Sequence, residues 1–296
     1  MHTLVIGLGS MGFGAAISCL RNGIQTSGYD LNPDVLKNFQ SEGGQSITSF
    51  DQLQLVDCVL IFVVNAEQAE SVLFDSELNA HLNPDALIIN CVTLAPSKAI
   101  DIAHRIDALG YQYIDAPVSG GAAKARKGRM SIMASGHPDA MKTAKVVLEA
   151  ISENVFYLGE KPGSGSQMKL INQLLAGVHI AAAAEAMNLA AALQMNLHEV
   201  IEVISKCAGS SWMFENRAPH IANGDYTPLS NVNIFVKDLG IVTEEALSNQ
   251  VITPLSDKAL ELYKMAFDSG LGGADDSAVV KILAEKSGVT LPESIT

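Results

Sequence analysis

The chain has little charge and few aromatic residues for its length, and it contains no cluster of basic residues. Only 17% of its 296 residues are charged and 5% are aromatic, whereas 48% are hydrophobic. Acidic residues outnumber basic ones by 32 to 19, which gives a formal net charge of -13. We therefore expect neither nucleic acid nor an anionic membrane surface as a partner. The hydrophobic content excludes a disordered chain and favours a compact fold.

Cysteine is also scarce and shows no metal-binding pattern. The chain has four cysteines without C-x-x-C spacing: Cys19, Cys58, Cys91 and Cys207. This pattern indicates neither a zinc site nor a disulfide framework, so we expect no metal. Free thiols in a reducing cytoplasm are the interpretation that it favours, and we expect a cytoplasmic protein.

Membrane and secretory signals are equally weak. The N-terminus has no basic stretch followed by an apolar one, so we expect no secretory signal. The longest apolar stretch, residues 174–193, contains His179, Glu185 and Asn188. Such a segment is a poor membrane span, and we predict a buried helix there.

The most informative motif that is present lies near the start of the chain, at Gly7-Leu8-Gly9-Ser10-Met11-Gly12. An apolar run precedes it and a helical pattern follows it, which is the context that a dinucleotide-binding G-x-G-x-x-G requires. Gly7 permits the tight turn, Gly9 lets the backbone approach a pyrophosphate, and Gly12 lets the helix pack near the sheet. The helix N-terminus would then hold the pyrophosphate.

A second predicted strand, residues 25–30, ends in a carboxylate. Asp30 follows Gly12 by 18 residues, where an acidic side chain accepts hydrogen bonds from the adenosine ribose and repels a 2′-phosphate. The sequence therefore predicts NAD as the cofactor rather than NADP. The alternative is that Asp30 is an ordinary turn residue before Asn32-Pro33.

Apolar runs alternate with helical segments as far as residue 160. Runs at 56–64 and 86–91 are near-continuously hydrophobic, which is typical of parallel strands covered on both faces. We predict crossover helices at 68–73 and 96–109, then strands at 131–136 and 155–159 around a helix at 138–151. The expected fold is α/β, with a doubly wound Rossmann-type domain over residues 1–162.

A Gly/Ser-rich segment at 160–166 breaks the periodicity, so we place the domain boundary after residue 162. Residues 163–296 are predicted to form an all-helical domain for substrate binding and oligomerisation. Its main element is a long helix at 167–195, apolar over much of its circumference. Further helices are predicted at 198–207, 231–248, 254–269 and 277–286.

Polar turns follow several predicted strands, where doubly wound sheets bind ligands. Asn65 follows the third apolar run, Thr93 follows the fourth, and Asp115-Ala-Pro-Val-Ser-Gly-Gly121 follows the run at 111–114. Each could be a plain cap or turn. Three of them converging on one edge favour a binding site.

Lys169 is the candidate acid/base. It lies in the first turns of the long helix, where we expect it to face the cleft between the domains. Desolvation near a helix N-terminus disfavours an ammonium ion, so such a lysine exchanges a proton more easily near neutral pH. It could accept the hydroxyl proton of an alcohol while hydride leaves the carbon. From spacing alone, a solvated lysine at a helix start is the more ordinary interpretation.

Three other features have both a functional and an ordinary interpretation. Lys237 lies in an apolar helix and needs a partner, which could be Asp238, a helix end or the cofactor. Residues 212–217, Trp-Met-Phe-Glu-Asn-Arg, could supply site residues or only core aromatics with a surface arginine. His179 could contact a ligand or be a satisfied core histidine.

Together these motifs resemble the 3-hydroxyisobutyrate dehydrogenase-like, or β-hydroxyacid dehydrogenase, family over essentially the whole chain. The matching features are the glycine motif at 7–12, the segment 115–121, Gly163-x-Gly165 followed by Lys169, and Lys237-Asp238-Leu239. The resemblance implies that Lys169 is the acid/base and that Ser119, Gly120 and Gly121 hold the substrate carboxylate. It further implies that Thr93 and Lys237 lie near the nicotinamide and that the protein is a homodimer or homotetramer.

One position departs from the family pattern. Members commonly carry a substrate-binding asparagine four residues after the lysine, and this chain has Gln173 there, with Asn172 one residue earlier. Because one helical residue is a rotation of about 100°, Asn172 cannot take over the same direction. We therefore expect a substrate other than 3-hydroxyisobutyrate.

Segments 173–181, 211–217, 224–228 and 275–279 resemble a branch of the family that oxidises the four-carbon sugar acid L-threonate at its C2 hydroxyl, giving 2-dehydro-L-erythronate. Gln173, His179 and Asn216 suit a polyhydroxylated substrate, because a site that pairs hydroxyls rejects analogues that lack them. Tartronate semialdehyde, 3-hydroxyisobutyrate or another small hydroxy acid is the alternative substrate. A non-catalytic NAD(H)-binding regulator is the alternative of a different class.

Overall fold

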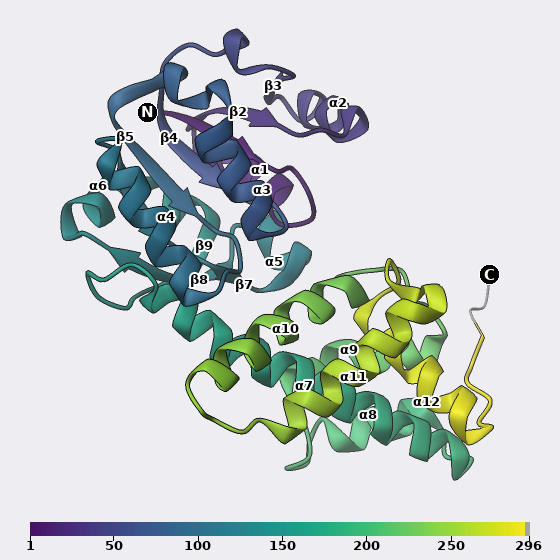
Figure 1. The fold of residues 1–296 in the computed structure, drawn as a ribbon. Coiled ribbons are helices and arrows are strands. Elements are labelled where there is room, and N and C mark those ends of the chain that lie inside the picture. Colours follow the sequence, from purple (N-terminus) through teal and green to yellow (C-terminus); the bar gives the residue numbers. More distant parts are fainter. Residues whose placement is uncertain (294–296) are drawn as a thin grey trace. The chain divides into compact units, whose positions relative to one another are not determined.

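The structure, a computed structural model, describes residues 1–293 (Figure 1). By its internal contacts the chain divides into two units, one comprising Met1–Lys169 and the other beginning at Leu170. The division lies inside one long helix, α7 (Ser164–Ala192), seven residues beyond the boundary expected after residue 162. The first turn of α7 bonds to the sheet of the first unit, which is why those residues group with it.

The first unit is built on one sheet in the order β3-β2-β1-β4-β5-β6-β8-β7, with β9 also pairing β8. The pairs among β1 to β6 are parallel, β8 runs antiparallel to β6 and β7, and β9 runs parallel to β8. The predicted doubly wound fold is thus confirmed, with an antiparallel addition at one side. The strands are β1 (His2–Ile6), β2 (Gln25–Tyr29), β3 (Gln45–Ile47), β4 (Val56–Ile61), β5 (Leu82–Asn90), β6 (Gln112–Asp115), β7 (Val118–Ser119), β8 (Met130–Gly136) and β9 (Ser152–Tyr157).

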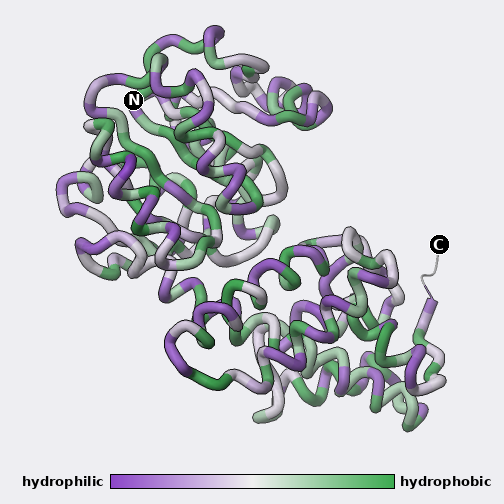
Figure 2. Tube along the Cα trace, in the orientation of Figure 1, coloured by the Kyte–Doolittle hydropathy of each residue, from purple (hydrophilic) through white to green (hydrophobic). Residues whose placement is uncertain are grey.

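Helices cover both faces of this sheet, as the near-continuous hydrophobic strands require. Alternate residues of β4 point to opposite sides: Cys58 and Leu60 pack in one apolar cluster, and Val59 and Ile61 pack in the other. Figure 2 shows the hydrophobic residues concentrated in these central strands. The first cluster lies against α1 (Gly12–Arg21), α2 (Pro33–Ser41), α5 (Gly121–Arg126) and α6 (Pro138–Ile151), and the second against α3 (Ala66–Glu70) and α4 (Pro96–Ala108).

The second unit is all helical within the described residues. Its core forms around α7, whose Ile180, Ala184 and Met187 are fully or almost fully buried. By length and composition alone α7 could cross a membrane, but this buried face makes it the central helix of a packed unit. The other helices are α8 (Leu197–Ile204), α9 (Trp212–Asn223), α10 (Val232–Ser248), α11 (Pro254–Ala266) and α12 (Val279–Ser287).

Candidate functional site

The glycine loop joins β1 to α1, and its three glycines meet different surroundings. A Cβ at Gly7, where φ is +86°, would lie 2.8 Å from the backbone of Phe62, and one at Gly12 would lie 1.9 Å from the Gly7 carbonyl oxygen. A Cβ at Gly9 would meet nothing within 4 Å. The protein's own packing therefore requires Gly7 and Gly12, whereas the open space beside Gly9 fits the close approach of a ligand.

The N-terminus of α1 has the features of an anion-binding site. No side chain of the described residues caps this helix, and its first turn holds no acidic residue. By contrast, Asn32 caps α2 and Asn65 caps α3 with their side-chain oxygens. Uncapped N–H groups and the helix dipole both attract a phosphate. The residues present thus fit the pyrophosphate of a dinucleotide.

Asp30 follows β2 and is brought against the glycine loop. Its Oδ2 accepts a hydrogen bond of 2.7 Å from the Leu8 backbone N–H, and its Oδ1 accepts one of 2.8 Å from Asn32. The loop is fixed to β2 a second time, because the Gly7 N–H donates to the Tyr29 carbonyl at 2.9 Å. Asp30 therefore adjoins the loop that would carry the pyrophosphate. A contact from Asp30 to the adenosine ribose requires this position, because the ribose is attached to the pyrophosphate.

The other strand ends hold the remaining site candidates of the first unit. Asn65 accepts a 2.9 Å hydrogen bond from the Gln68 N–H as the cap of α3, and Thr93 is half-buried after β5. Ser119 ends β7, and Gly120 and Gly121 lead into α5 with φ values of +133° and +71°. L-side chains rarely adopt such φ angles. Glycine therefore sets the backbone conformation of this turn at the start of α5.

Asp115, at the end of β6, has a structural role that the sequence analysis missed. Its carboxylate is 1% exposed and receives the backbone N–H groups of Gly163, at 3.0 Å, and Ser166, at 2.8 Å. The hydroxyls of Ser166 and Ser135 donate to it at 2.8 and 3.3 Å. Burial raises the pKa of the Asp115 carboxyl, and the hydrogen bonds from Ser166 oppose that rise. A buried carboxylate needs hydrogen-bond partners. An aspartate at the end of an apolar strand was therefore the signal in the sequence that could have pointed to this role.

Lys169 stands one turn beyond Ser166 on α7. Ser166 is fully buried, Lys169 is 7% exposed and Gln173 is 7% exposed. Residues three or four apart share a helix face, so these three side chains form one buried polar stripe along the start of α7. The solvated lysine considered as the ordinary interpretation is wrong, because the Lys169 side chain is buried.

Gln173 belongs to a hydrogen-bonded cluster in the second unit. Its Nε2 donates to Oδ2 of the buried Asp238, and its Oε1 accepts a hydrogen bond of 2.9 Å from Asn172. Lys237 Nζ lies 2.7 Å from Asp238 Oδ1. The structure thus brings together three predicted site residues, Asn172, Gln173 and Lys237, around an aspartate that had been considered only as the lysine's partner.

His179 and Asn216 have other surroundings. His179 is half-buried on α7, six residues beyond Gln173, which is a rotation of about 240° around the helix. It therefore leaves the face shared by Lys169 and Gln173. Asn216 lies half-buried on α9, and its Oδ1 accepts a hydrogen bond from Arg217.

The interpretation of residues 212–217 as core aromatics with a surface arginine is confirmed for Phe214, which is buried in the core of the second unit, and is wrong for Trp212 and Arg217. Trp212 is 53% exposed, whereas Arg217 is 5% exposed. Arg217 forms a two-pronged ion pair with the buried Asp276, with its Nε 2.5 Å from Oδ1 and its Nη2 3.1 Å from Oδ2. Burial raises the pKa of Asp276 to about 6, and Arg217 opposes that shift. This pair joins α9 to the segment before α12.

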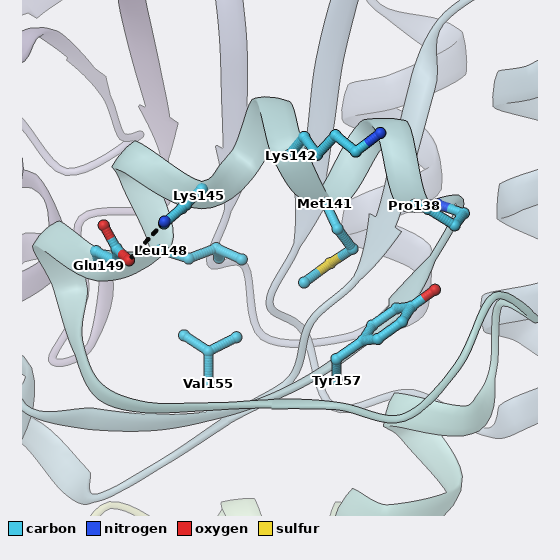
Figure 3. Close-up of a pocket in the computed structure, with 8 residues that line it drawn as sticks. All are labelled: Pro138, Met141, Lys142, Lys145, Leu148, Glu149, Val155 and Tyr157. Atoms are coloured by element: carbon cyan, nitrogen blue, oxygen red, sulfur yellow. Dashed lines mark ion pairs between the residues drawn. The ribbon is translucent and has the colours of Figure 1, made fainter.

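A cavity of about 340 Å³ lies elsewhere in the first unit, between α6 and β9 (Figure 3). It is lined mainly by apolar groups such as Met141, Leu148 and Val155, and none of the predicted site residues borders it. Figure 3 shows Lys145 of this cavity directed at Glu149, with 3.8 Å between their charged groups. We therefore assign no role in binding to this cavity.

Comparison with known families gives one match for each part of the chain. Residues 3–159 match the model described as the NAD binding domain of 6-phosphogluconate dehydrogenase. Residues 163–283 match the model described as NAD-binding of NADP-dependent 3-hydroxyisobutyrate dehydrogenase. The matches cover the segments that carry the glycine loop, Lys169 and Lys237.

Individual relatives are similar over nearly the whole chain. An L-threonate dehydrogenase of Cupriavidus necator is 49% identical, with 97% of each chain covered. An L-threonate dehydrogenase of Escherichia coli K12 is 45% identical, covering 98% of this chain and 96% of the relative. A crystal structure described as 3-hydroxyisobutyrate dehydrogenase from Salmonella typhimurium superposes with a TM-score of 0.90 at 47% identity, covering 95% of this chain and 99% of that one.

Proposed function

Because the chain belongs to the 3-hydroxyisobutyrate dehydrogenase-like family and is an NAD-dependent hydroxy-acid dehydrogenase, we propose that it oxidises L-threonate to 2-dehydro-L-erythronate. The observation that carries this choice is the 45 and 49% identity to L-threonate dehydrogenases over almost the full length of both chains. The balanced reaction releases one hydride from C2 to NAD and one proton from the C2 hydroxyl.

We assign the cofactor to the glycine loop of the first unit. The open space at Gly9 and the uncapped start of α1 support a pyrophosphate there, and Asp30 supports a ribose contact beside the loop. Bound NAD supplies the hydride acceptor. The motif positions Leu8, Ser10 and Met11 complete the loop. Further cofactor contacts are assigned to Asn65, Thr93 and Lys237.

Lys169 is proposed to move the proton. In the oxidation direction its neutral amine accepts the proton of the C2 hydroxyl as the hydride departs, and its ammonium returns that proton to the carbonyl oxygen in reduction. The burial of Lys169 on the helix face that it shares with Gln173 supports this role, because both side chains are withdrawn from solvent at the start of α7.

The substrate contacts follow from chemistry and helix face. Ser119, Gly120 and Gly121 are assigned to the carboxylate. Gln173 shares a buried helix face with Lys169 and is held by Asp238, which supports a role in pairing substrate hydroxyls. Asn172, His179 and Asn216 are assigned to the remaining hydroxyls. We also propose a homodimer or homotetramer, which analytical ultracentrifugation would measure.

A second candidate substrate is 3-hydroxyisobutyrate, because the similar Salmonella structure bears that enzyme's name. Gln173 distinguishes the two candidates. A side chain held by Asp238 offers hydrogen-bonding groups that suit a chain of hydroxyls better than the methyl group of 3-hydroxyisobutyrate.

The test is NADH formation, followed by absorbance, with NAD or NADP and a panel of acids. The panel contains L-threonate, D-threonate, D-erythronate, D-glycerate, L-tartrate and 3-hydroxyisobutyrate. Selective turnover of L-threonate with NAD is expected. Turnover of another acid alone would overturn the substrate, and a chain that binds NADH but oxidises nothing in the panel would favour the regulatory alternative.

Lys169→Met tests the proposed acid/base. It should reduce turnover to a small residual rate while NADH binding, measured by fluorescence, is retained. Lys161→Met is the matched control, because Lys161 is an exposed lysine just before the same helix. Full turnover by Lys169→Met would remove the lysine from the mechanism.

A further inference from the structure

The first turn of α7 is attached to the sheet by two buried side chains. Asp115 of β6 accepts the N–H groups of Gly163 and Ser166 and the hydroxyl of Ser166. Ser135 of β8 donates to Asp115 at 3.3 Å and accepts the Gly165 N–H at 3.0 Å. The first N–H groups of a helix have no carbonyl acceptor within the helix. Here the N–H groups of Gly163, Gly165 and Ser166 are bound instead by side chains of the neighbouring strands β6 and β8.

The same turn is also packed against backbone on several sides. A Cβ at Gly165 would lie 2.3 Å from the Met133 carbonyl oxygen and 2.8 Å from that of Asp115. A Cβ at Gly163 would lie 2.8 Å from the Ile100 side chain of α4. Such approaches leave the start of α7 little room to shift, so its position is set by β6, β8 and α4 together.

The position of Lys169 depends on this attachment. Lys169 lies three residues after Ser166, about 4.5 Å along the helix axis and on the same face. Any tilt or rotation of the first turn therefore also moves the Cα of Lys169 and the side chain that extends from it. Proton transfer requires the donor and acceptor atoms to lie within hydrogen-bond reach, which makes the reaction sensitive to such a shift.

We propose that Asp115 is a positioning residue for Lys169, holding the first turn of α7 so that the lysine amine meets the substrate hydroxyl. This role rests on the proposed function, since it takes Lys169 as the acid/base. Asp115 touches neither cofactor nor substrate in this scheme. Ser135 assists by binding both Asp115 and the Gly165 N–H.

The first test compares Asp115→Ala with Asp115→Asn in steady-state oxidation of L-threonate by NAD. The alanine variant removes both carboxylate oxygens that hold Gly163 and Ser166, and it should lower kcat about 100-fold, because a misplacement of about 1 Å costs that much. The KM for NAD and the fluorescence-measured Kd for NADH should stay at the wild-type values. The asparagine oxygen still accepts the two N–H groups, so this variant should recover most of kcat.

A gentler pair of variants covers the case in which Asp115→Ala does not fold. Ser135→Ala should lower kcat about tenfold, since it frees the Gly165 N–H while Asp115 remains. Ser27→Ala is the matched control: Ser27 is a fully buried serine of the same sheet, and its hydroxyl bonds to His2 at 2.8 Å. Equal kcat values for these two variants would overturn the proposal.

A double variant separates positioning from general damage. If Asp115 acts through Lys169, adding Asp115→Ala to Lys169→Met should not reduce the residual rate further. If the double variant instead shows the product of the two single-variant losses in kcat, the positioning role is overturned. Full activity of Lys169→Met alone would overturn the proposed acid/base, whereas wild-type kcat in a folded Asp115→Ala beside an inactive Lys169→Met would overturn only this inference.

Discussion

Replacing Gly9 by alanine should weaken cofactor binding without weakening the fold. The added methyl meets no protein atom within 4 Å, and Gly9 is not among the residues with positive φ. An alanine at a compatible position stabilises a fold by about 0.4–1 kcal/mol, because it restricts the unfolded chain. The free energy of unfolding should therefore stay the same or rise slightly.

Binding should change in the opposite direction. The methyl group added by Gly9→Ala would occupy the space in which a pyrophosphate approaches the backbone, and an extra methyl in a close-packed contact costs about 1–3 kcal/mol. Since 1.4 kcal/mol is about tenfold in Kd, NADH should bind roughly 5- to 150-fold more weakly. A fluorescence titration with NADH measures this, and urea unfolding measures the stability.

Gly12→Ala gives the contrasting result within the same motif. Its Cβ would lie 1.9 Å from the Gly7 oxygen and 2.8 Å from the Phe62 Cβ, so the backbone must move. We expect a loss of about 1–3 kcal/mol in the free energy of unfolding. Gly273→Ala, at another open glycine, is the control for binding. Wild-type NADH affinity in Gly9→Ala, or destabilisation equal to that of Gly12→Ala, would refute the reasoning.

Three further predictions concern single side chains. Asp30→Ala should reduce the preference for NAD over NADP in kcat/KM, because it removes both a ribose acceptor and the charge that repels a 2′-phosphate; an unchanged preference would contradict the assignment. Burial raises the pKa of Asp276 from 3.8 to about 6, so on acidification the folded state binds a proton at Asp276 before the unfolded state does. The free energy of unfolding of wild type should therefore rise by about 1 kcal/mol relative to that of Asp276→Asn as the pH falls from about 7 to about 5. Urea unfolding at both pH values measures this difference, and a relative loss on acidification would mean that Arg217 keeps the carboxylate ionised. Gln173→Asn shortens the side chain that reaches Asp238 and should raise the KM for L-threonate about tenfold; a KM within twofold of wild type would remove Gln173 from the substrate site.

Local patterns predicted most of the fold. The helix expected at 138–151 is α6 with the same bounds, and the glycine motif does lie between β1 and α1. Both are local features: helical periodicity in the first case, and a turn that only glycine allows in the second. Helix α9 was not predicted, because the short apolar stretch around Trp212 has no sustained periodicity and its N-cap at Ser211 was overlooked.

Contacts between distant residues could not be predicted in this way. Asp115 meets Gly163 and Ser166 from 48 and 51 residues away, and Arg217 meets Asp276 from 59 residues away. No periodicity connects such partners. The general rule that a buried charge needs a partner could have flagged Asp115, but burial itself becomes visible only when the strands are assembled.

The attachment of α7 to Asp115 also sets an order of events during protein synthesis. Domains generally fold as units while the chain is made, beginning at the N-terminus. When β9 has just left the ribosome, all nine strands of the first unit exist, but the Asp115 carboxylate still has no N–H donors from Gly163 and Ser166. The nascent nucleotide-binding unit therefore becomes complete only when the next helix emerges, and that helix brings Lys169 with it.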